Sequence, residues 1–93
     1  METKDSINWE NLGYLIVNKN SLKIMKTLSR VETTPTSLSK ECNLNISVIS
    51  KNLNRLERRG LVFCLTPNNR KGKIFSLSKE GKSILKLIDK IMI

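Results

Sequence analysis

Residues 53–62 read LNRLERRGLV, and two periodicities meet inside them. The first part continues a helical pattern in which one apolar side carries Ile49, Leu53 and Leu56. Gly60 is a residue type that often ends a helix in the left-handed conformation, and an extended apolar run follows it. This stretch therefore predicts a helix over residues 46–59 that passes directly into a strand.

A second helix is predicted just upstream. Thr34 is a suitable N-cap, and Pro35 suits the first helical position because the amide hydrogen it lacks would be unpaired there. This helix is expected over residues 35–42. The segment 43–45, Asn-Leu-Asn, supplies two turn-forming residues before the helix 46–59. Two helices joined by so short a turn form a helix-turn-helix arrangement.

The chain before residue 31 is expected to be helical as well. A helix over residues 20–30, with Asn20 as its N-cap, is indicated by one apolar stripe of Ile24, Leu28 and Val31. In the first eighteen residues a helical spacing is formed by Trp9, Leu12, Leu15 and Ile16. We expect a helix there, although Gly13 and the β-favouring residues 14–17 also fit an extended segment.

After Gly60 the periodicity becomes extended. The segments 61–66 and 73–77 read as paired strands around a turn-rich connection, which predicts a β-hairpin over residues 61–77. Ser78 is then a suitable cap for a last helix over residues 79–92. The expected fold is one domain over residues 1–93, mainly α with a small β-hairpin.

Composition excludes several classes of protein. Ninety-three residues suffice for one core, and the absence of histidine removes the usual general base and metal ligand, so we expect neither an enzyme nor a metal site. No apolar run is long enough to span a membrane, and the first residues lack the pattern of a secretory signal, which predicts a cytoplasmic protein. Cys42 and Cys64 are expected to be small buried hydrophobes, with a redox pair as the alternative.

Charge gives the first indication of function. The net charge is +9, and ten of the seventeen basic residues fall within residues 40–82 with only three acids. The polar side of the helix 46–59 presents hydroxyl, amide and cationic groups, namely Ser47, Ser50, Lys51, Asn54, Arg55 and Arg58. The hairpin tip adds Arg70, Lys71 and Lys73 around Gly72, without an acid. A solvated surface would explain either group alone, but the two together favour a polyanionic partner.

The order of these elements resembles the winged helix-turn-helix transcriptional regulators, over residues 34–81. Three motifs carry the resemblance: the opening of the second helix at residues 34–41, the pattern L-x-x-L-x-x-x-G-L-[VI] at residues 53–62, and L-[ST]-x-x-G at residues 77–81. The resemblance implies binding to double-stranded DNA in the manner of the MarR or ArsR regulators. It also implies a homodimer, with the helix 46–59 in the major groove and the hairpin, or wing, beside it.

Carried over by position, the implied DNA contacts are the polar residues of the helix 46–59 and the three cations of the wing. Thr36 and Ser37, near the start of the second helix, would hold a phosphate. The chain lacks the Cys-Val-Cys and histidine metal sites of ArsR sensors. It is also shorter than a typical MarR protein, with only one clear helix after the wing. Neither a metal nor a cofactor is therefore expected.

A dimer interface is predicted from the two ends of the chain. On the last helix, Leu85 and Met92 are expected to pack on their own domain, while a second stripe would meet a partner. With the N-terminal segment, the predicted interface comprises Trp9, Leu12, Leu15, Ile84, Ile88 and Ile91. The alternative is that both stripes close a single small core. Two other functions remain open: a winged-helix module that binds another protein, and a winged helix that binds RNA.

Overall fold

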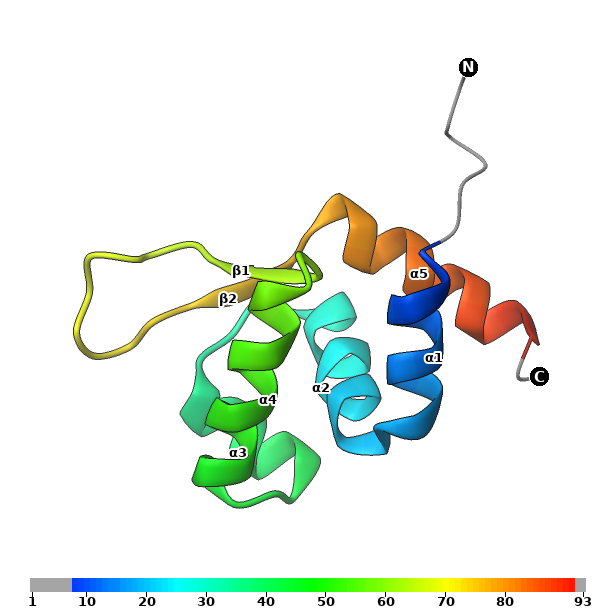
Figure 1. Cartoon of the computed structure of the whole chain (residues 1–93). Helices are drawn as coiled ribbons and strands as arrows, with labels where there is room; N and C mark the ends of the chain where they lie inside the picture. Colours follow the sequence, from blue (N-terminus) through cyan, green and yellow to red (C-terminus); the bar gives the residue numbers. More distant parts are fainter. Residues whose placement is uncertain (1–7, 92–93) are drawn as a thin grey trace.

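The computed structural model describes residues 8–91 and contains five helices and a two-stranded antiparallel sheet (Figure 1). In chain order the elements are α1 (Trp9–Val17), α2 (Lys19–Arg30), α3 (Pro35–Cys42), α4 (Ile46–Arg58), β1 (Val62–Cys64), β2 (Phe75–Leu77) and α5 (Lys79–Ile91). The expected fold class, mainly α with a small hairpin, is confirmed. None of the helices within these residues is long and apolar enough to cross a membrane.

Side-chain caps set the start of three helices. The backbone N–H of Ser37 donates to Thr34 Oγ1 at 3.2 Å, that of Ser47 to Asn45 Oδ1 at 3.0 Å, and that of Gly81 to Ser78 Oγ at 3.0 Å. Each contact satisfies an amide that has no partner inside its helix. These caps explain why α3, α4 and α5 begin where the sequence predicted.

The start of α2 was predicted wrongly. The helix begins at Lys19, so Asn18 and not Asn20 occupies the capping position. The side chain of Asn18 is already engaged, because its Nδ2 donates to Tyr14 O at 2.8 Å and so closes the end of α1. A single residue thus joins α1 to α2, and the N-terminal segment is helical from Trp9.

The sheet is shorter than predicted but has an extra partner. β1 and β2 pair with Val62 opposite Leu77, and beyond the strands the N–H of Leu65 still donates to Ile74 O at 2.7 Å. On the other edge, Thr33 and Phe75 exchange two backbone hydrogen bonds of 3.2 and 2.8 Å. This bridge, which no pattern in the sequence predicted, joins the wing to the segment between α2 and α3.

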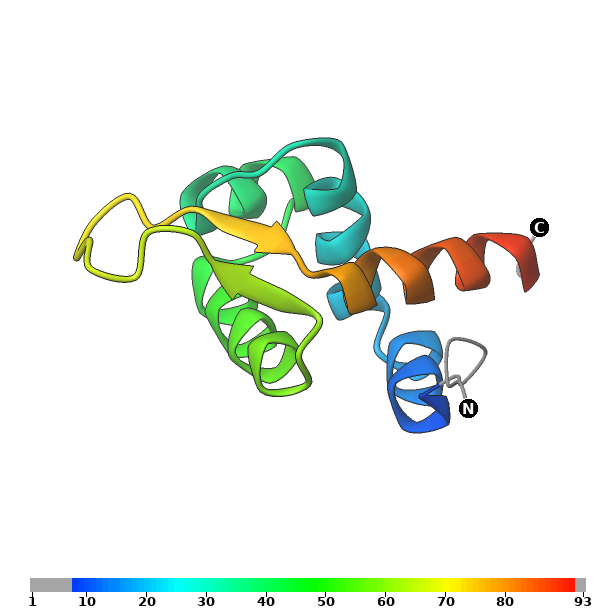
Figure 2. The same ribbon diagram turned by 90° about the horizontal axis from the view of Figure 1, so that it is seen from above.

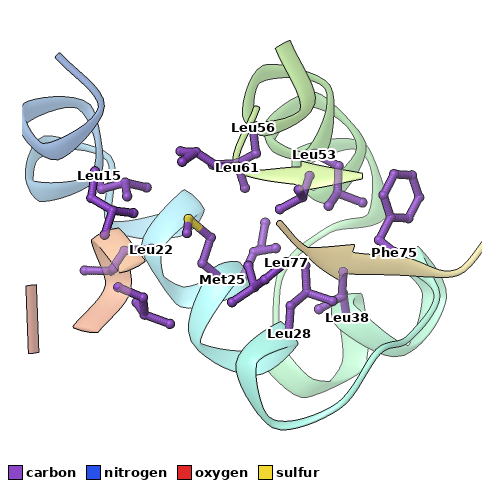
Figure 3. Packing of buried hydrophobic residues seen from close by; sticks show 14 of the residues in the cluster. Leu15, Leu22, Met25, Leu28, Leu38, Leu53, Leu56, Leu61, Phe75 and Leu77 are labelled. Carbon is purple, nitrogen blue, oxygen red and sulfur yellow. The ribbon is translucent and has the colours of Figure 1, made fainter. Parts of the chain in front are cut away.

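The core lies between the helices and the sheet (Figure 3). It joins the apolar side of α4 to α2, α3 and β2, through side chains such as Leu28, Leu38, Leu53, Phe75 and Leu77. Cys42 is buried in it, Cys64 is half-buried at its edge, and both are free thiols.

Four of the six residues predicted at a dimer interface are instead buried in this core: Leu12, Leu15, Ile84 and Ile88. α1 packs on both α2 and α5, and α5 also packs on α2 and β2. Both apolar stripes are therefore needed to close one small core, and Leu85 is buried beside them. Trp9 and Ile91 remain 68% and 55% exposed, while Met92 lies outside the described residues.

Seen from above, the wing and the end of α5 lie at opposite ends of the molecule (Figure 2). α4 lies beside the base of the wing, and α1 lies beside α5. The fold thus separates the end that carries the wing from the end where Trp9 and Ile91 are exposed.

Candidate nucleic-acid interface

The outer face of α4 is polar from Ser47 to Arg58. Its inner side is buried, and the six polar residues predicted on the outer side are all exposed: Ser47, Ser50, Lys51, Asn54, Arg55 and Arg58. Glu57 is the one acidic side chain on this helix. The helix therefore presents hydroxyl, amide and cationic groups outward from a rigid element.

A buried polar contact fixes α4 against α2. Ser21 Oγ donates to Asn52 Oδ1 at 2.6 Å, and Asn52 Nδ2 donates to Val48 O at 2.8 Å within α4. Both Ser21 and Asn52 are buried. Sequence reasoning missed this pair, although an asparagine within the apolar sector of an amphipathic helix is a detectable signal, because a buried amide requires partners.

The wing lies against the start of α4. A groove between the wing tip and the first turns of α3 and α4 is lined by Thr34, Pro35, Thr36, Ile46, Ser50, Arg70, Gly72 and Lys73. Four of the predicted site residues, Thr36, Ser50, Arg70 and Lys73, therefore share one concave surface. We call this surface the wing groove.

Local hydrogen bonds shape the wing tip. Thr66 Oγ1 accepts from the N–H of Ile74 at 3.0 Å, and Thr66 O accepts from the N–H of Asn69 at 3.1 Å. Gly72 has φ 68°, a left-handed conformation that a residue with a Cβ rarely adopts. This turn leaves Lys71 exposed, but Lys71 does not line the wing groove.

The two residues predicted at the start of α3 differ in their surroundings. Thr36 is exposed and lines the wing groove. Ser37 is half-buried, and its Oγ accepts from Thr34 Oγ1 at 3.3 Å. Thr36 is thus available to a ligand, whereas the hydroxyl of Ser37 is already part of the cap.

A second cleft borders the opposite edge of α4. It lies between the α1–α2 junction and the later turns of α4 and is lined by Val17, Asn18, Lys19, Asn20, Asn52 and Arg55. Lys19 and Arg55 thus lie along the same cleft. Lys19 was not among the predicted site residues because its position beside α4 depends on tertiary packing, which the chain does not encode locally.

Arg59 joins the end of α4 to α1. Its Cζ lies 4.0 Å from the centroid of the Tyr14 ring, and its Nη1 donates to Asn11 Oδ1 at 3.0 Å. A guanidinium over an aromatic face is a favourable cation–π arrangement. Both Arg58 and Arg59 are exposed, but Arg59 links the end of α4 to α1 through these contacts.

Comparison with known proteins agrees with this geometry. A family model described as a winged helix-turn-helix matches residues 21–92. The chain belongs to the winged helix-turn-helix family. The resemblance drawn from residues 34–81 is thereby confirmed at the level of the family. Among curated protein sequences, none matches this winged-helix chain.

Solved structures share the fold of this winged-helix protein. A MarR family transcription regulator superposes with a TM-score of 0.75 at 23% identity over 82% of this chain and 52% of its own. A mutant of E. coli MarR complexed with operator DNA gives 0.74 at 24% identity, over 89% and 61%. Lactococcus lactis ZitR in complex with DNA gives 0.68 at 15% identity, over 75% and 49%. The chain thus spans about half to three fifths of the length of these proteins.

The winged-helix surface also contains a residue that sequence reasoning passed over. Ile46 begins α4, is exposed, and lines the wing groove beside Ser50. Its position four residues before Ser50 was a signal that both lie on one side of the helix.

Within residues 8–91, no three His, Cys, Asp or Glu side chains lie close enough to hold a metal ion.

Proposed function

We propose that this chain is a sequence-specific regulator of transcription that binds double-stranded DNA and has no catalytic activity of its own. In this proposal α4 enters the major groove, and the wing contacts the phosphate backbone or the minor groove. One observation carries the proposal: the wing groove brings Ser50, on the polar outer face of α4, together with the cations Arg70 and Lys73.

The chemistry of the two surfaces supports different contacts. The major groove is wide enough for an α-helix and displays hydrogen-bond donors and acceptors, which amide, hydroxyl and cationic side chains can read. Asn54 and Lys51, exposed along α4, are suited to base edges. The cations of the wing are suited to phosphates, which supply affinity without sequence information.

Two of the structurally similar proteins were solved with DNA, the E. coli MarR mutant with operator DNA and ZitR with DNA. Their identities of 24% and 15% establish a shared fold alone, so the same activity in this chain is part of the proposal. The polar face of α4 and the wing groove supply the independent, chemical support.

We further propose a homodimer that places its two α4 helices in half-sites roughly 34 Å apart, one turn of DNA, or a multiple of it. Since four of the residues first predicted at the interface are buried within the chain, the proposed contact is narrowed to the exposed apolar groups of α1 and the end of α5. These groups are Trp9, Ile16, Val17 and Ile91. Their exposure supports an interface because a tryptophan is seldom left uncovered.

The direct test is binding to duplex DNA over a range of salt concentrations, after genomic fragments have been footprinted to find a protected site. Lys71→Ala should weaken binding to all sequences and lower the slope of log K against log salt by about 1, because one phosphate contact is lost. Lys51→Ala and Asn54→Ala should reduce the preference for the protected site over random duplex. Lys86→Ala is the matched control, since this exposed lysine lies on α5.

Unchanged affinity for the protected site in both Lys51→Ala and Lys71→Ala would show that the assigned faces are wrong. Competition with single-stranded RNA distinguishes an RNA-binding winged helix, because that RNA would displace duplex DNA from an RNA-binding protein. The control Lys86→Ala should leave both the slope and the sequence preference unchanged.

A second function, a module that binds another protein, is favoured by the exposed apolar side of α1. Val17 is 77% exposed and Trp9 is 68% exposed. Such a module would show no steep loss of DNA affinity with added salt, and Trp9→Ala would weaken the protein complex. The salt titration therefore separates the two functions.

A further inference from the structure

One residue of the α4 surface does not fit a purely polar interface. Ile46 is 46% exposed, while the other exposed residues of α4 are all polar or charged. It stands at the first position of the helix, directly after the cap formed by Asn45. Ile46 thus offers an apolar contact on a surface whose other exposed groups are polar or cationic.

The position of Ile46 links it to the DNA-binding surface. Ile46 and Ser50 are one helical turn apart, and both line the wing groove together with Arg70 and Lys73. In the proposed complex, a duplex seated against those two cations and Ser50 would therefore lie over Ile46 as well. The first turn of a recognition helix is the part that meets base edges in helix-turn-helix complexes.

The chemistry of the major groove limits what Ile46 can meet there. Guanine and adenine display hydrogen-bond donors and acceptors on that side, and cytosine adds only a small C5–H, whereas thymine carries a 5-methyl group. An isoleucine pressed on donors or acceptors would remove their water without replacing the hydrogen bonds, which is unfavourable. Contact with a methyl group buries apolar surface of both the isoleucine and the thymine, and no polar atom loses a hydrogen bond.

We propose that Ile46 is a specificity-determining residue that recognises the 5-methyl group of a thymine at one position of each half-site. This inference rests on the proposed DNA-binding function. It predicts that the base pair opposite Ile46 is an A·T pair, oriented so that the methyl group of its thymine contacts the isoleucine. The hydrogen-bonding residues Lys51 and Asn54 would read neighbouring pairs.

The test is a double-mutant cycle that combines a substitution in the protein with a base replacement in the DNA. A duplex that the wild-type chain selects from a random pool is remade with each thymine in turn replaced by uracil, which keeps the base pair and lacks the methyl group. At one thymine per half-site, wild type should lose about fourfold in affinity, the value of one buried methyl-sized group. Ile46→Ala should bind more weakly than wild type and show no further loss on that replacement.

Two controls separate this coupling from general weakening. Val31→Ala removes another exposed aliphatic side chain, one that does not line the wing groove, and should show the same uracil effect as wild type. Ile46→Val retains part of the apolar contact and should retain part of the effect. Thermal unfolding of each variant checks that the fold persists, as expected for an exposed position.

The outcomes distinguish the inference from the function on which it rests. If binding is sequence-specific and salt-dependent but no uracil replacement affects wild type and Ile46→Ala differently, the methyl contact is overturned and DNA binding stands. If no duplex is bound in a salt-dependent manner, both are overturned. A loss of about fourfold at one thymine, absent in Ile46→Ala, supports the inference.

Discussion

Replacement of Gly81 by alanine tests how the wing is joined to α5. Gly81 lies in the first turn of α5, and a Cβ built on it would collide with the carbonyl oxygen of Leu61. That oxygen also accepts the N–H of Ser78 at 3.0 Å, and Ser78 Oγ donates to Gly60 O at 2.6 Å. The start of α5 is thus held directly on the turn between α4 and β1, with no room for a methyl group between them.

The size of the effect follows from these contacts. The neighbour is backbone, not a flexible side chain, so relief of the collision must displace α5 from the turn. Such overpacking costs about 1–3 kcal/mol, and weakening of a hydrogen bond to Leu61 or Gly60 costs about 1 kcal/mol more. Alanine recovers about 1 kcal/mol as the better helix former. Gly81→Ala should therefore lower the free energy of unfolding by about 1–3 kcal/mol.

Gly13 provides a matched control, because it is also a glycine within a helix, and a Cβ built on it meets no atom within 4 Å. Gly13→Ala should raise the stability by about 0.5–1 kcal/mol through helix propensity alone. In thermal unfolding followed by circular dichroism, about 1 kcal/mol corresponds to about 4–8 °C in a domain of this size. The two variants should shift Tm in opposite directions. Equal or parallel shifts would refute the close contact between Gly81 and Leu61.

Three further substitutions test the packing around the site by urea unfolding. Asn52→Ala should lower the free energy of unfolding by about 1–3 kcal/mol, because the buried hydroxyl of Ser21 loses its acceptor at 2.6 Å and keeps only the Tyr14 hydroxyl at 3.0 Å; a loss near zero would contradict the bond between Ser21 and Asn52. Thr34→Ala should cost about 1 kcal/mol through loss of the cap of α3, and Thr34→Ser, which keeps the oxygen, should recover most of it. Leu38→Ala truncates a fully buried side chain and should lower the free energy of unfolding by about 2–5 kcal/mol, whereas Val31→Ala, at an exposed position, should change it by less than about 0.5 kcal/mol. Similar losses in the two variants would contradict the burial of Leu38 in the core.

Local signals in the sequence predicted the helices, the caps of α3 and α5, and the left-handed glycine at the end of α4, although they misplaced the cap of α2. Gly60 has φ 75°, and the predicted caps Thr34 and Ser78 each accept an amide hydrogen bond. Asn45, predicted only as a turn residue before α4, also caps its helix. These features depend on residues within four positions of one another, so the chain encodes them directly. The bridge between Thr33 and Phe75 joins a single residue before α3 to the wing. One residue shows no periodicity, so no pattern in the sequence indicated this bridge.

Periodicity identified which residues share a face, but not what covers that face. The polar side of α4 was predicted correctly as exposed, since polar residues rarely find enough partners inside a small core. The same reasoning placed Ile84 and Ile88 at a partner surface, although both are buried within the chain, where α5 packs on α1, α2 and β2. An apolar stripe is satisfied equally by its own domain or by a second copy, and only the tertiary arrangement distinguishes them.

The contacts on the inner side of α4 bear on how its outer face would act on DNA. Asn52 is bonded to Ser21 on α2, and Arg59 is stacked on Tyr14 and bonded to Asn11, both on α1. Directional polar contacts fix the rotation of a helix about its axis more narrowly than apolar packing does, because they tolerate smaller changes in angle. In the proposed homodimer α1 contributes the exposed Trp9, so the distance and rotation between the two α4 helices would be set through this same helix. The spacing of half-sites that the dimer accepts would then depend on the contacts of Arg59 with α1 as much as on the side chains that touch the bases.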